Sequence, residues 1–289
     1  MHNSATLAAP AARRHSARLS KLAGRGLHYL VLSLIAVITV YPFWWTLVTA
    51  LSTEGDVFAF PPPLLPSAPS LNNFKEAVSS IDLLAFYKNS VIIALATVAG
   101  TLLVSALAAY PLARMRFPGR KLVFGAILAT MILPSEVNFL VNFITVSKLQ
   151  LTDSYSGVVL PTLAGAVGIF LMKQAFEAVP QDLIDAARVD GAGEWQIFWK
   201  IMLPLSRPAL AALTILTMVS AWNQYIWPSI VMSSPDKFPL SVGVLYLSGA
   251  FSFKTRVVAA GAVLTVLPIL LVFLFTQRYF LRGFDGAVK

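Results

Sequence analysis

The segment "DAARVDGAGEWQIFWKIMLP", residues 185–204, is polar at its start and lies between two long apolar runs at 154–172 and 208–235. It carries five charged side chains within sixteen residues, in a chain of which only 12% of residues are charged and 57% are hydrophobic. A run of about 20 uncharged, mostly apolar residues crosses the ~30 Å hydrocarbon core of a bilayer as a helix. The flanking runs are therefore predicted to lie in a membrane, and the segment between them outside it.

The same kind of apolar run recurs along the whole chain. Besides the two flanking runs, stretches without charge occur at 26–53, 89–113 and 257–277, and a run at 122–147 is interrupted only by Glu136. So few charged side chains do not cover the surface of a water-soluble protein of this length. The sequence predicts an all-α polytopic membrane protein with six transmembrane helices.

The distribution of basic residues predicts how these helices are oriented. Sixteen of the 22 Lys and Arg residues fall on the side that holds both termini and the segment 185–204, and cytoplasmic loops carry such an excess. Both termini are therefore expected in the cytoplasm, with an unstructured basic tail at 1–25, one six-span domain at 26–281 and a tail at 282–289. Aromatic residues of the first and fifth spans are expected at the outer interface: Tyr41, Trp44, Trp45, Trp222 and Trp227.

The segment itself, with its flanks at about 178–204, predicts two short helices. Pro180 suits a first helical turn, and Gly191 ends that helix because glycine adopts the left-handed conformation without a Cβ penalty. Leu183, Ile184, Ala187 and Val189 give it an apolar face. A second helix is expected from Glu194 to Pro204. Such a pair either lies at the membrane interface as a simple connection or inserts into a cleft on another protein.

The spacing of residues in this segment resembles a known motif. Asp185-Ala186-Ala187, then three residues, Gly191, nine residues and Ile201-Met202-Leu203-Pro204 match the EAA loop of permease subunits of bacterial ABC importers, with Asp185 in place of the usual glutamate. The Asp190-Gly191 pair is similar to the sugar-transporting branch. So are "PFWWTLVTALS" (42–52), Asn89-Ser90, "AAYPLARMRFPG" (108–119), "WNQYIWP" (222–228) and "QRYFLRGFDGAVK" (277–289), which most resemble the smaller permease of the maltose type.

This resemblance implies a fold, a set of partners and a location. The fold is that of a type I ABC importer permease in the bacterial cytoplasmic (inner) membrane. The partners are a second permease subunit, two ATPase subunits that hold ATP and Mg, and an external substrate-binding protein. The region 185–191 is implied to be the coupling helix, which transmits the closure of the ATPases to the spans. The residues implied in this coupling are Asp185, Ala186, Ala187, Asp190, Gly191, Ile201, Leu203 and Pro204.

A few polar side chains inside the predicted spans are candidates for a substrate pathway. Glu136 is the one acidic residue within a span, and an intramembrane carboxylate is a functional candidate by default. Amides and aromatic faces suit sugar recognition, since they bind hydroxyl groups and the flat ring. Further candidates on this ground are Asn138, Asn142, Trp222, Asn223 and Gln224. Hydrogen bonds between helices explain the same amides equally well.

Several function classes are disfavoured by the residues that the chain lacks. It has no cysteine, no G-x-x-x-x-G-K-[ST] loop, and three histidines that all fall at the N-terminus, so neither an ATPase nor another enzyme is expected, and no cofactor or metal on this chain. The basic charge is assigned to the membrane topology rather than to nucleic acid. The expected cargo is a sugar or oligosaccharide, with glycerol phosphate or a polyol as the alternative. An ion-coupled secondary transporter and a membrane scaffold or sensor are competing hypotheses.

The first outer loop has an unusual composition. The stretch "FAFPPPLLPSAPS" at 58–70 contains three consecutive prolines, which favour a stiff extended conformation. The sequence is compatible with a spacer laid across the outer surface and with a docking surface for an external partner.

Overall fold

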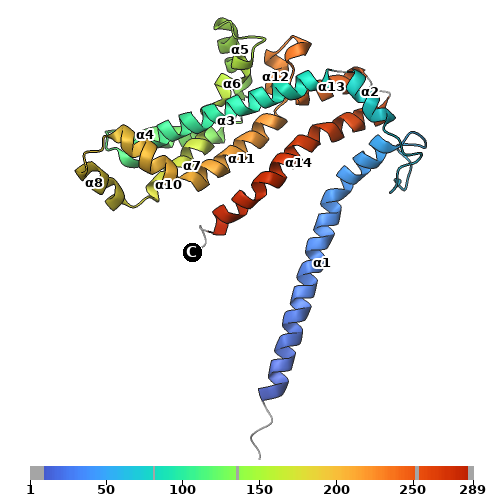
Figure 1. The fold of residues 1–289 in the computed structure, drawn as a ribbon, viewed down its shortest axis with the longest axis horizontal. Coiled ribbons are helices and arrows are strands. Elements are labelled where there is room, and N and C mark those ends of the chain that lie inside the picture. The colour runs from blue at the N-terminus through green and yellow to red at the C-terminus, as the bar shows by residue number, and fades with distance from the viewer. Residues whose placement is uncertain (1–9, 81, 135–136, 251–253, 286–289) are drawn as a thin grey trace, which may run out of the picture.

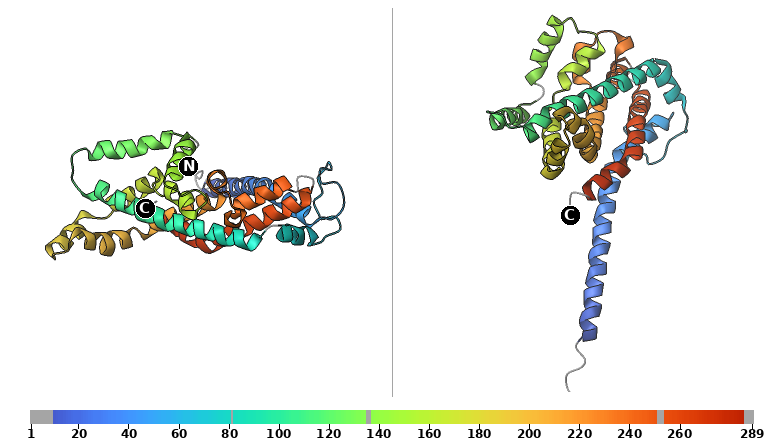
Figure 2. Two further views of the ribbon diagram at one scale, coloured as in Figure 1. Left: turned by 90° about the horizontal axis from the view of Figure 1, so that it is seen from above. Right: turned by 60° about the vertical axis from the view of Figure 1, so that its left-hand side comes forward.

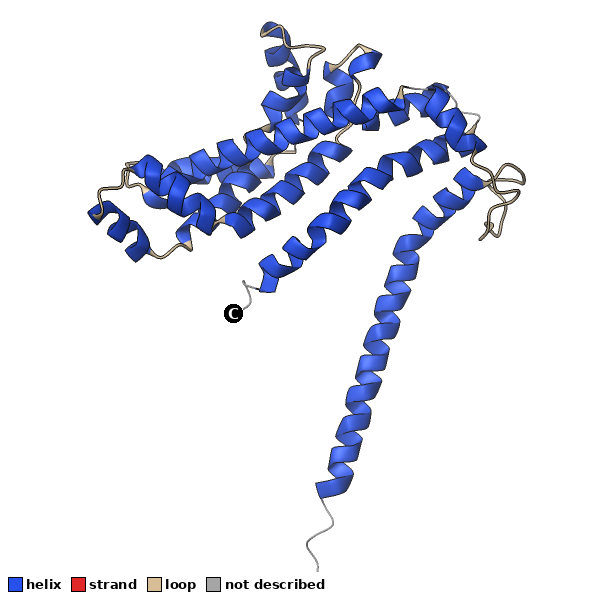
Figure 3. Ribbon diagram, in the orientation of Figure 1, coloured by secondary structure: helices blue, strands red, loops and turns tan. Residues whose placement is uncertain are grey.

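The computed structural model describes residues 10–80, 82–134, 137–250 and 254–285, and within these ranges it is helical with no strand (Figures 1 and 3). The helices in chain order are α1 (Pro10–Leu51), α2 (Asn72–Ser80), α3 (Leu83–Arg114), α4 (Arg120–Ala129), η1 (Thr130–Ile132), α5 (Asn138–Lys148), α6 (Tyr155–Val159), η3 (Leu160–Thr162), α7 (Ala166–Glu177), α8 (Gln181–Val189), α9 (Glu194–Ile197), η4 (Phe198–Met202), α10 (Leu203–Leu205), α11 (Arg207–Asn223), α12 (Ile226–Val231), η5 (Pro235–Lys237), α13 (Leu240–Ala250) and α14 (Thr255–Asp285).

Helix α3 runs along the length of the bundle and packs on both α7 and α11 (Figure 1). Its first turn is capped by the Asp82 carboxylate, which accepts a hydrogen bond of 3.1 Å from the Ala85 N–H. Close contact with α7 depends on small residues, because a Cβ at Gly168 would lie 2.4 Å from the Ser105 hydroxyl oxygen. Helix α3 ends at Arg114, and α4 starts after Gly119, which has a φ of +80°.

Helix α1 leaves the bundle, and only its last turns are buried (Figure 2). Its side chains from 25 to 44 are exposed, which suits a helix that faces lipid or a partner subunit. The helix begins at Pro10, so the prediction of an unstructured tail over all of 1–25 is wrong. The reason is compositional, since alanine, arginine, leucine and lysine dominate 11–25 and are strong helix formers.

Helices occupy each of the six predicted apolar runs within the described residues, but they differ in length and continuity. Among the described residues, two helices, at Arg25–Leu51 and Leu83–Arg114, are long and apolar enough to cross a membrane alone. Counting each of two bent pairs as one span raises this number to four, compared with the six spans predicted. The pairs are Tyr155–Thr162 with Ala166–Glu177, bent by 51°, and Glu194–Leu205 with Arg207–Asn223, bent by 75°.

Three of the remaining predictions need correction in detail. The run 122–147 is divided between α4, η1 and α5, because Pro134 has no N–H to donate to a continuous helix. The last helix, α14, continues to Asp285, beyond the predicted start of a tail at 282. The two tryptophans predicted at the outer interface of the fifth span, Trp222 and Trp227, are both buried. Their indole N–H groups donate to the Thr265 and Val158 carbonyls at 3.4 and 3.1 Å.

At the end of the bundle opposite α8, polar contacts connect α3 to later parts of the chain. Asn89 of α3 donates to the carbonyls of Asp236 and Phe238 at 2.8 and 3.0 Å, and its side-chain oxygen accepts from the Tyr155 hydroxyl at 2.8 Å. The neighbouring Ser90 hydroxyl accepts the Leu240 N–H at 2.7 Å. These contacts fix η5, the residues that follow it and the first residue of α6 to the start of α3.

Candidate coupling site

Helix α8 lies at the far end of the bundle from α2 and α13, beyond the end of α7 (Figure 1). Pro180, in an extended conformation, precedes it as the N-cap, and Asp182 in the first turn complements the positive end of the helix dipole. Ile184 is fully buried, whereas Leu183 is 47% exposed and Val189 is 87% exposed. The predicted single apolar face is therefore divided, with Ile184 on the bundle and two large apolar side chains directed away from it.

A tight turn at Gly191 connects α8 to the next helix, as predicted. Gly191 has a φ of +83°, and its N–H donates to the Arg188 carbonyl at 3.0 Å while the Ala192 N–H donates to the Ala187 carbonyl at 2.9 Å. These bonds satisfy carbonyls that the end of a helix leaves free. Among the described residues outside the turn, no atom lies within 4 Å of the place where a Cβ on Gly191 would be. The glycine is thus required by its backbone conformation and not by lack of space.

The predicted second helix is irregular. It begins at Glu194, passes through the π-helical turn η4 and ends at Leu205, followed by the 75° bend at Ser206. Pro204 lies inside the last turn, so the helix ends slightly later than predicted. A π-helical turn inserted in a helix is frequently associated with function. Here it separates the motif residue Gly191 from the start of α11.

A chain of polar side chains connects α8 to α3. The Gln181 amide donates to Asp185 at 2.9 Å, and Arg188 donates to Asp185 at 3.4 Å and to Glu194 at 2.9 and 3.2 Å. Hydrogen bonding to Glu194 raises the pKa of Arg188 above its already high ordinary value, and the hydrogen bond from Tyr110 lowers the pKa of Glu194, so both groups are charged at neutral pH. The second carboxylate oxygen of Glu194 accepts a short hydrogen bond from the Tyr110 hydroxyl of α3.

Arg114, in the last turn of α3, makes a second connection. Its guanidinium donates to the Gln181 side-chain oxygen at 2.9 Å and to the backbone carbonyls of Phe176 and Val179. Those carbonyls belong to the end of α7 and to the linker before α8. One planar group with several donors therefore ties together three helices.

An apolar cluster lies beneath these polar contacts. The Phe198 ring packs edge to face on Tyr110 with ring centroids 5.3 Å apart, and Phe176 packs on both rings at 6.2 Å. Ile184 of α8 is part of the same buried cluster. Helix α8 is thus held on one side by an apolar core and polar bonds, and is free on the other side.

Sequence reasoning identified α8 and Gly191 but not the residues that anchor them. Tyr110, Arg114, Gln181 and Glu194 were not singled out as site residues. The sequence did contain a usable signal, since Tyr110 and Arg114 are four residues apart and therefore lie on one face of α3, at the end of the helix next to α8. Of the motif residues, Met202 next to Ile201 and Leu203 is fully buried, while those two are partly buried against the same cluster.

The candidate substrate-pathway residues that the structure describes lie on α5 and at the end of α11. Glu136 lies outside the described residues. Asn138 and Asn142 are on α5, whereas Asn223 at the end of α11 donates to the Val219 carbonyl of its own helix at 3.0 Å. The backbone carbonyl of Gln224 accepts a hydrogen bond from Ser241 at 2.8 Å. Trp222 is buried among Phe86, Ala94 and Leu240, so its ring does not present an open face to a sugar.

Comparison with known proteins connects this geometry to a family. The family model described as "Binding-protein-dependent transport system inner membrane component" matches residues 101–285, which include the whole of the coupling site. The chain belongs to this family. It is an inner-membrane component of a transport system and not an enzyme, as predicted from the sequence.

Relatives of known name support the assignment over nearly the full length. The chain is 36% identical over 263 residues to the arabinooligosaccharides transport system permease protein AraQ of Halalkalibacterium halodurans, which covers 88% of this chain and 93% of that protein. It is 35% identical over 270 residues to the sn-glycerol-3-phosphate transport system permease protein UgpE of Yersinia pestis, covering 90% and 96%.

Solved structures agree with the fold. A chain in the crystal structure of a bacterial ABC transporter involved in the import of the acidic polysaccharide alginate superposes with a TM-score of 0.78 at 27% identity, covering 90% of this chain and 98% of that one. The predicted resemblance to ABC importer permeases of the sugar-transporting branch is therefore confirmed.

Proposed function

We propose that this permease uses α8 to receive the movement of cytoplasmic ATPase subunits. The observation that carries the proposal is the division of α8 into an anchored side and a free side, with Leu183 and Val189 exposed next to the turn at Gly191. Exposed apolar side chains on a short, firmly anchored helix suit insertion into a groove on another protein. The matched spacing from Asp185 to Pro204 supports the same role.

The proposed assembly follows from this role. It contains a second permease, two ATPases that bind ATP and Mg, and an external substrate-binding protein, with six spans and both termini of this chain in the cytoplasm. Closure of the ATPases displaces α8, and the two connections at Tyr110 and Arg114 transmit the displacement to α3. A rigid-body switch between inward-facing and outward-facing states follows, driven by the different contacts that α8 makes in each state.

For the cargo we propose a neutral oligosaccharide. None of the six apolar runs contains a Lys or Arg, so this chain offers no cation inside the membrane for a phosphate or a carboxylate. The hydroxyl groups of a sugar are bound by amides such as those of Asn138 and Asn142. The proposed pathway residues are these two together with Glu136, Asn223 and Gln224. The alternative cargo is glycerol phosphate, which one relative carries in its name; the companion permease would then have to supply the positive charge.

Co-purification with the ATPase tests the proposed role of α8. We expect the unsubstituted chain to bring down an ATPase, and Gly191→Asp to lose most of it while still inserting into the membrane. Gly191→Ala adds only the left-handed strain of about 1–2 kcal/mol, whereas Gly191→Asn is the matched control, because asparagine tolerates that conformation. Transport without ATP by a chain that purifies alone would refute the proposal.

Uptake measurements test the cargo separately. Vesicles that contain the assembled importer are supplied with labelled arabino-oligosaccharide or with labelled sn-glycerol 3-phosphate, each with its binding protein. We expect uptake of the oligosaccharide. Uptake of the phosphate ester instead would leave the coupling role intact and replace the cargo.

A further inference from the structure

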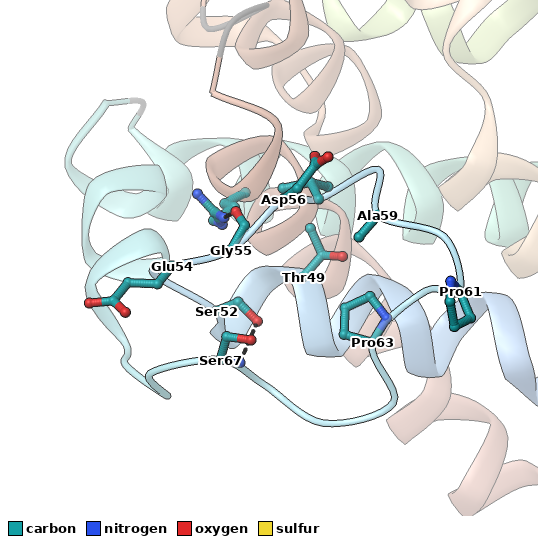
Figure 4. A pocket seen from close by; sticks show the side chains of 11 residues that line it. Thr49, Ser52, Glu54, Gly55, Asp56, Ala59, Pro61, Pro63 and Ser67 are labelled. Carbon is teal, nitrogen blue, oxygen red and sulfur yellow. Dashed lines mark hydrogen bonds between the residues drawn. The ribbon is translucent and has the colours of Figure 1, made fainter.

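The proline-containing first outer loop folds back along α1 instead of projecting away from it. Its ends are fastened at the Ser52–Pro69 bridge, where the Thr53 N–H donates to the Ser67 carbonyl at 3.1 Å and the Thr53 hydroxyl donates to the Ala68 carbonyl at 2.8 Å. Figure 4 shows Pro61 and Pro63 of this loop beside α1, around a pocket of about 210 Å³. The segment between the two ends, 54–66, is thus a closed surface loop.

A hydrogen bond from Trp44 fixes the position of this loop along α1. Its indole N–H donates to the Leu64 carbonyl at 2.9 Å, although α1 continues for seven residues beyond Trp44. Seven helical residues correspond to about 10 Å along the axis. The tip of the loop therefore lies about 10 Å nearer to the membrane centre than the end of α1.

The length of α1 places this tip at the membrane boundary. About 20 residues are needed to cross the hydrocarbon core, and counting them from Gly26, after the basic Arg25, ends at Trp45. Tryptophan is enriched at this depth, where its ring is apolar and its N–H finds a polar partner. Leu64 and its neighbours are held beside that ring.

The side chains at the tip have the character of a membrane-inserted surface. Phe60 is 96% exposed and Leu65 is 73% exposed, and Phe58 and Leu64 are exposed as well. No charged residue occurs between 57 and 74, whereas Glu54 and Asp56 are near the fastened ends of the loop. Large apolar side chains without charge, presented by a stiff proline segment, are costly in water and favourable at the boundary of lipid headgroups and acyl chains.

We propose that Phe60, Leu64 and Leu65 insert into the outer leaflet of the bilayer and anchor the outer end of α1 at a fixed depth. Lipid is the occupant that the depth of Trp44 and the absence of charge favour, in preference to the external binding protein. The inference depends on the membrane location of the family and not on the cargo or on the role of α8.

The absence of cysteine in this chain allows a direct test. Single substitutions Phe60→Cys and Leu65→Cys, with Glu54→Cys as the matched control in the same loop, each carry one nitroxide label. The full chain, with any subunits that co-purify, is reconstituted in vesicles of phosphatidylethanolamine and phosphatidylglycerol, and the unsubstituted chain gives the background labelling. Collision rates with oxygen, which concentrates in lipid, and with a water-soluble nickel chelate report the depth of each label.

We expect a several-fold higher oxygen-to-nickel collision ratio at Phe60→Cys and Leu65→Cys than at Glu54→Cys, before and after addition of the external binding protein. Equal ratios at all three positions would place the loop in water and overturn the inference. Exclusion of both reagents in the absence of the binding protein would show packing against another subunit. Protection that appears only after the binding protein is added would assign the surface to that protein. Both outcomes also overturn it.

Discussion

Removal of one hydroxyl group tests whether α3 is mechanically connected to α8. In Tyr110→Phe the ring remains packed on Phe176 and Phe198, and only the hydrogen bond to Glu194 is lost. A hydrogen bond to a charged group contributes about 1.5–3 kcal/mol. Because the Glu194 side chain is 43% exposed and keeps its bonds to Arg188, water replaces the hydroxyl in part, and we expect about 1.5 kcal/mol.

The functional consequence is a weaker connection between ATP hydrolysis and transport. Since about 1.4 kcal/mol corresponds to a factor of ten in an equilibrium, up to about tenfold fewer substrate molecules are expected to cross per ATP hydrolysed. The assay measures uptake and hydrolysis in the same vesicles and compares their ratio. Binding of the ATPase itself is expected to be unchanged, because Leu183 and Val189 are not altered.

Tyr87→Phe provides the control on the same helix. The Tyr87 hydroxyl donates to the Leu264 carbonyl far from α8, so its loss reduces stability without touching the coupling site. An unchanged ratio in Tyr110→Phe, or an equal fall in both variants, would refute the proposed connection. Combination with Glu194→Gln adds a further criterion, because two residues that share one bond have non-additive effects.

Three further variants test other parts of the fold. Gly157→Ala is expected to lower stability by about 1–3 kcal/mol, because its Cβ would lie 2.1 Å from the Leu151 carbonyl oxygen. The measurement is the thermal unfolding midpoint in detergent. Gly125→Ala, which has no such neighbour among the described residues, is expected to leave the midpoint unchanged or raise it. Hydrogen bonds from Lys237 and Ser234 hold the pKa of the Asp153 carboxyl group well below its usual range. The stabilising contribution of this carboxylate is therefore complete above about pH 4 and is lost as the pH falls toward the lowered pKa. Asp153→Asn is expected to remove this acid dependence of the unfolding midpoint. Arg114→Lys is expected to reduce stability by about 1–3 kcal/mol in the same unfolding assay, because one ammonium group does not reproduce the planar fork that binds the Phe176 and Val179 carbonyls; a midpoint equal to that of the unsubstituted chain would argue against this contact.

The sequence was most informative where one physical constraint decides the outcome. Membrane location followed from the charge-free runs, and the turn at Gly191 followed from a backbone conformation that only glycine adopts freely. The division of 122–147 into separate helices was harder to foresee, although Pro134 indicates the point of interruption. The direction that the chain takes after the interruption at Pro134 depends on contacts of α4 and η1 with α7, which a local sequence pattern does not reveal.

The anchoring residues of the coupling site illustrate what a single sequence does not reveal. Tyr110 and Glu194 are 84 positions apart, and their meeting depends on how α3 packs on η4. Similarly, Trp222 is the type of residue expected at an interface or a sugar site, but its indole is enclosed by α3, which comes earlier in the chain, and by α13 and α14, which come later. Burial of this kind is a tertiary property, so polar or aromatic character alone led to a wrong location.

Because of the 75° bend at Ser206, the segment from Glu194 to Leu205 projects from the start of α11 as a lever arm. Its twelve residues extend about 18 Å from the pivot, so a turn of roughly ten degrees moves the far end by about 3 Å. That travel is comparable to the length of the hydrogen bond by which Glu194 holds Tyr110. Under the proposed role of α8, a rotation of this size breaks the Glu194–Tyr110 hydrogen bond, so we expect the segment to have two positions, one with this bond formed and one with it broken.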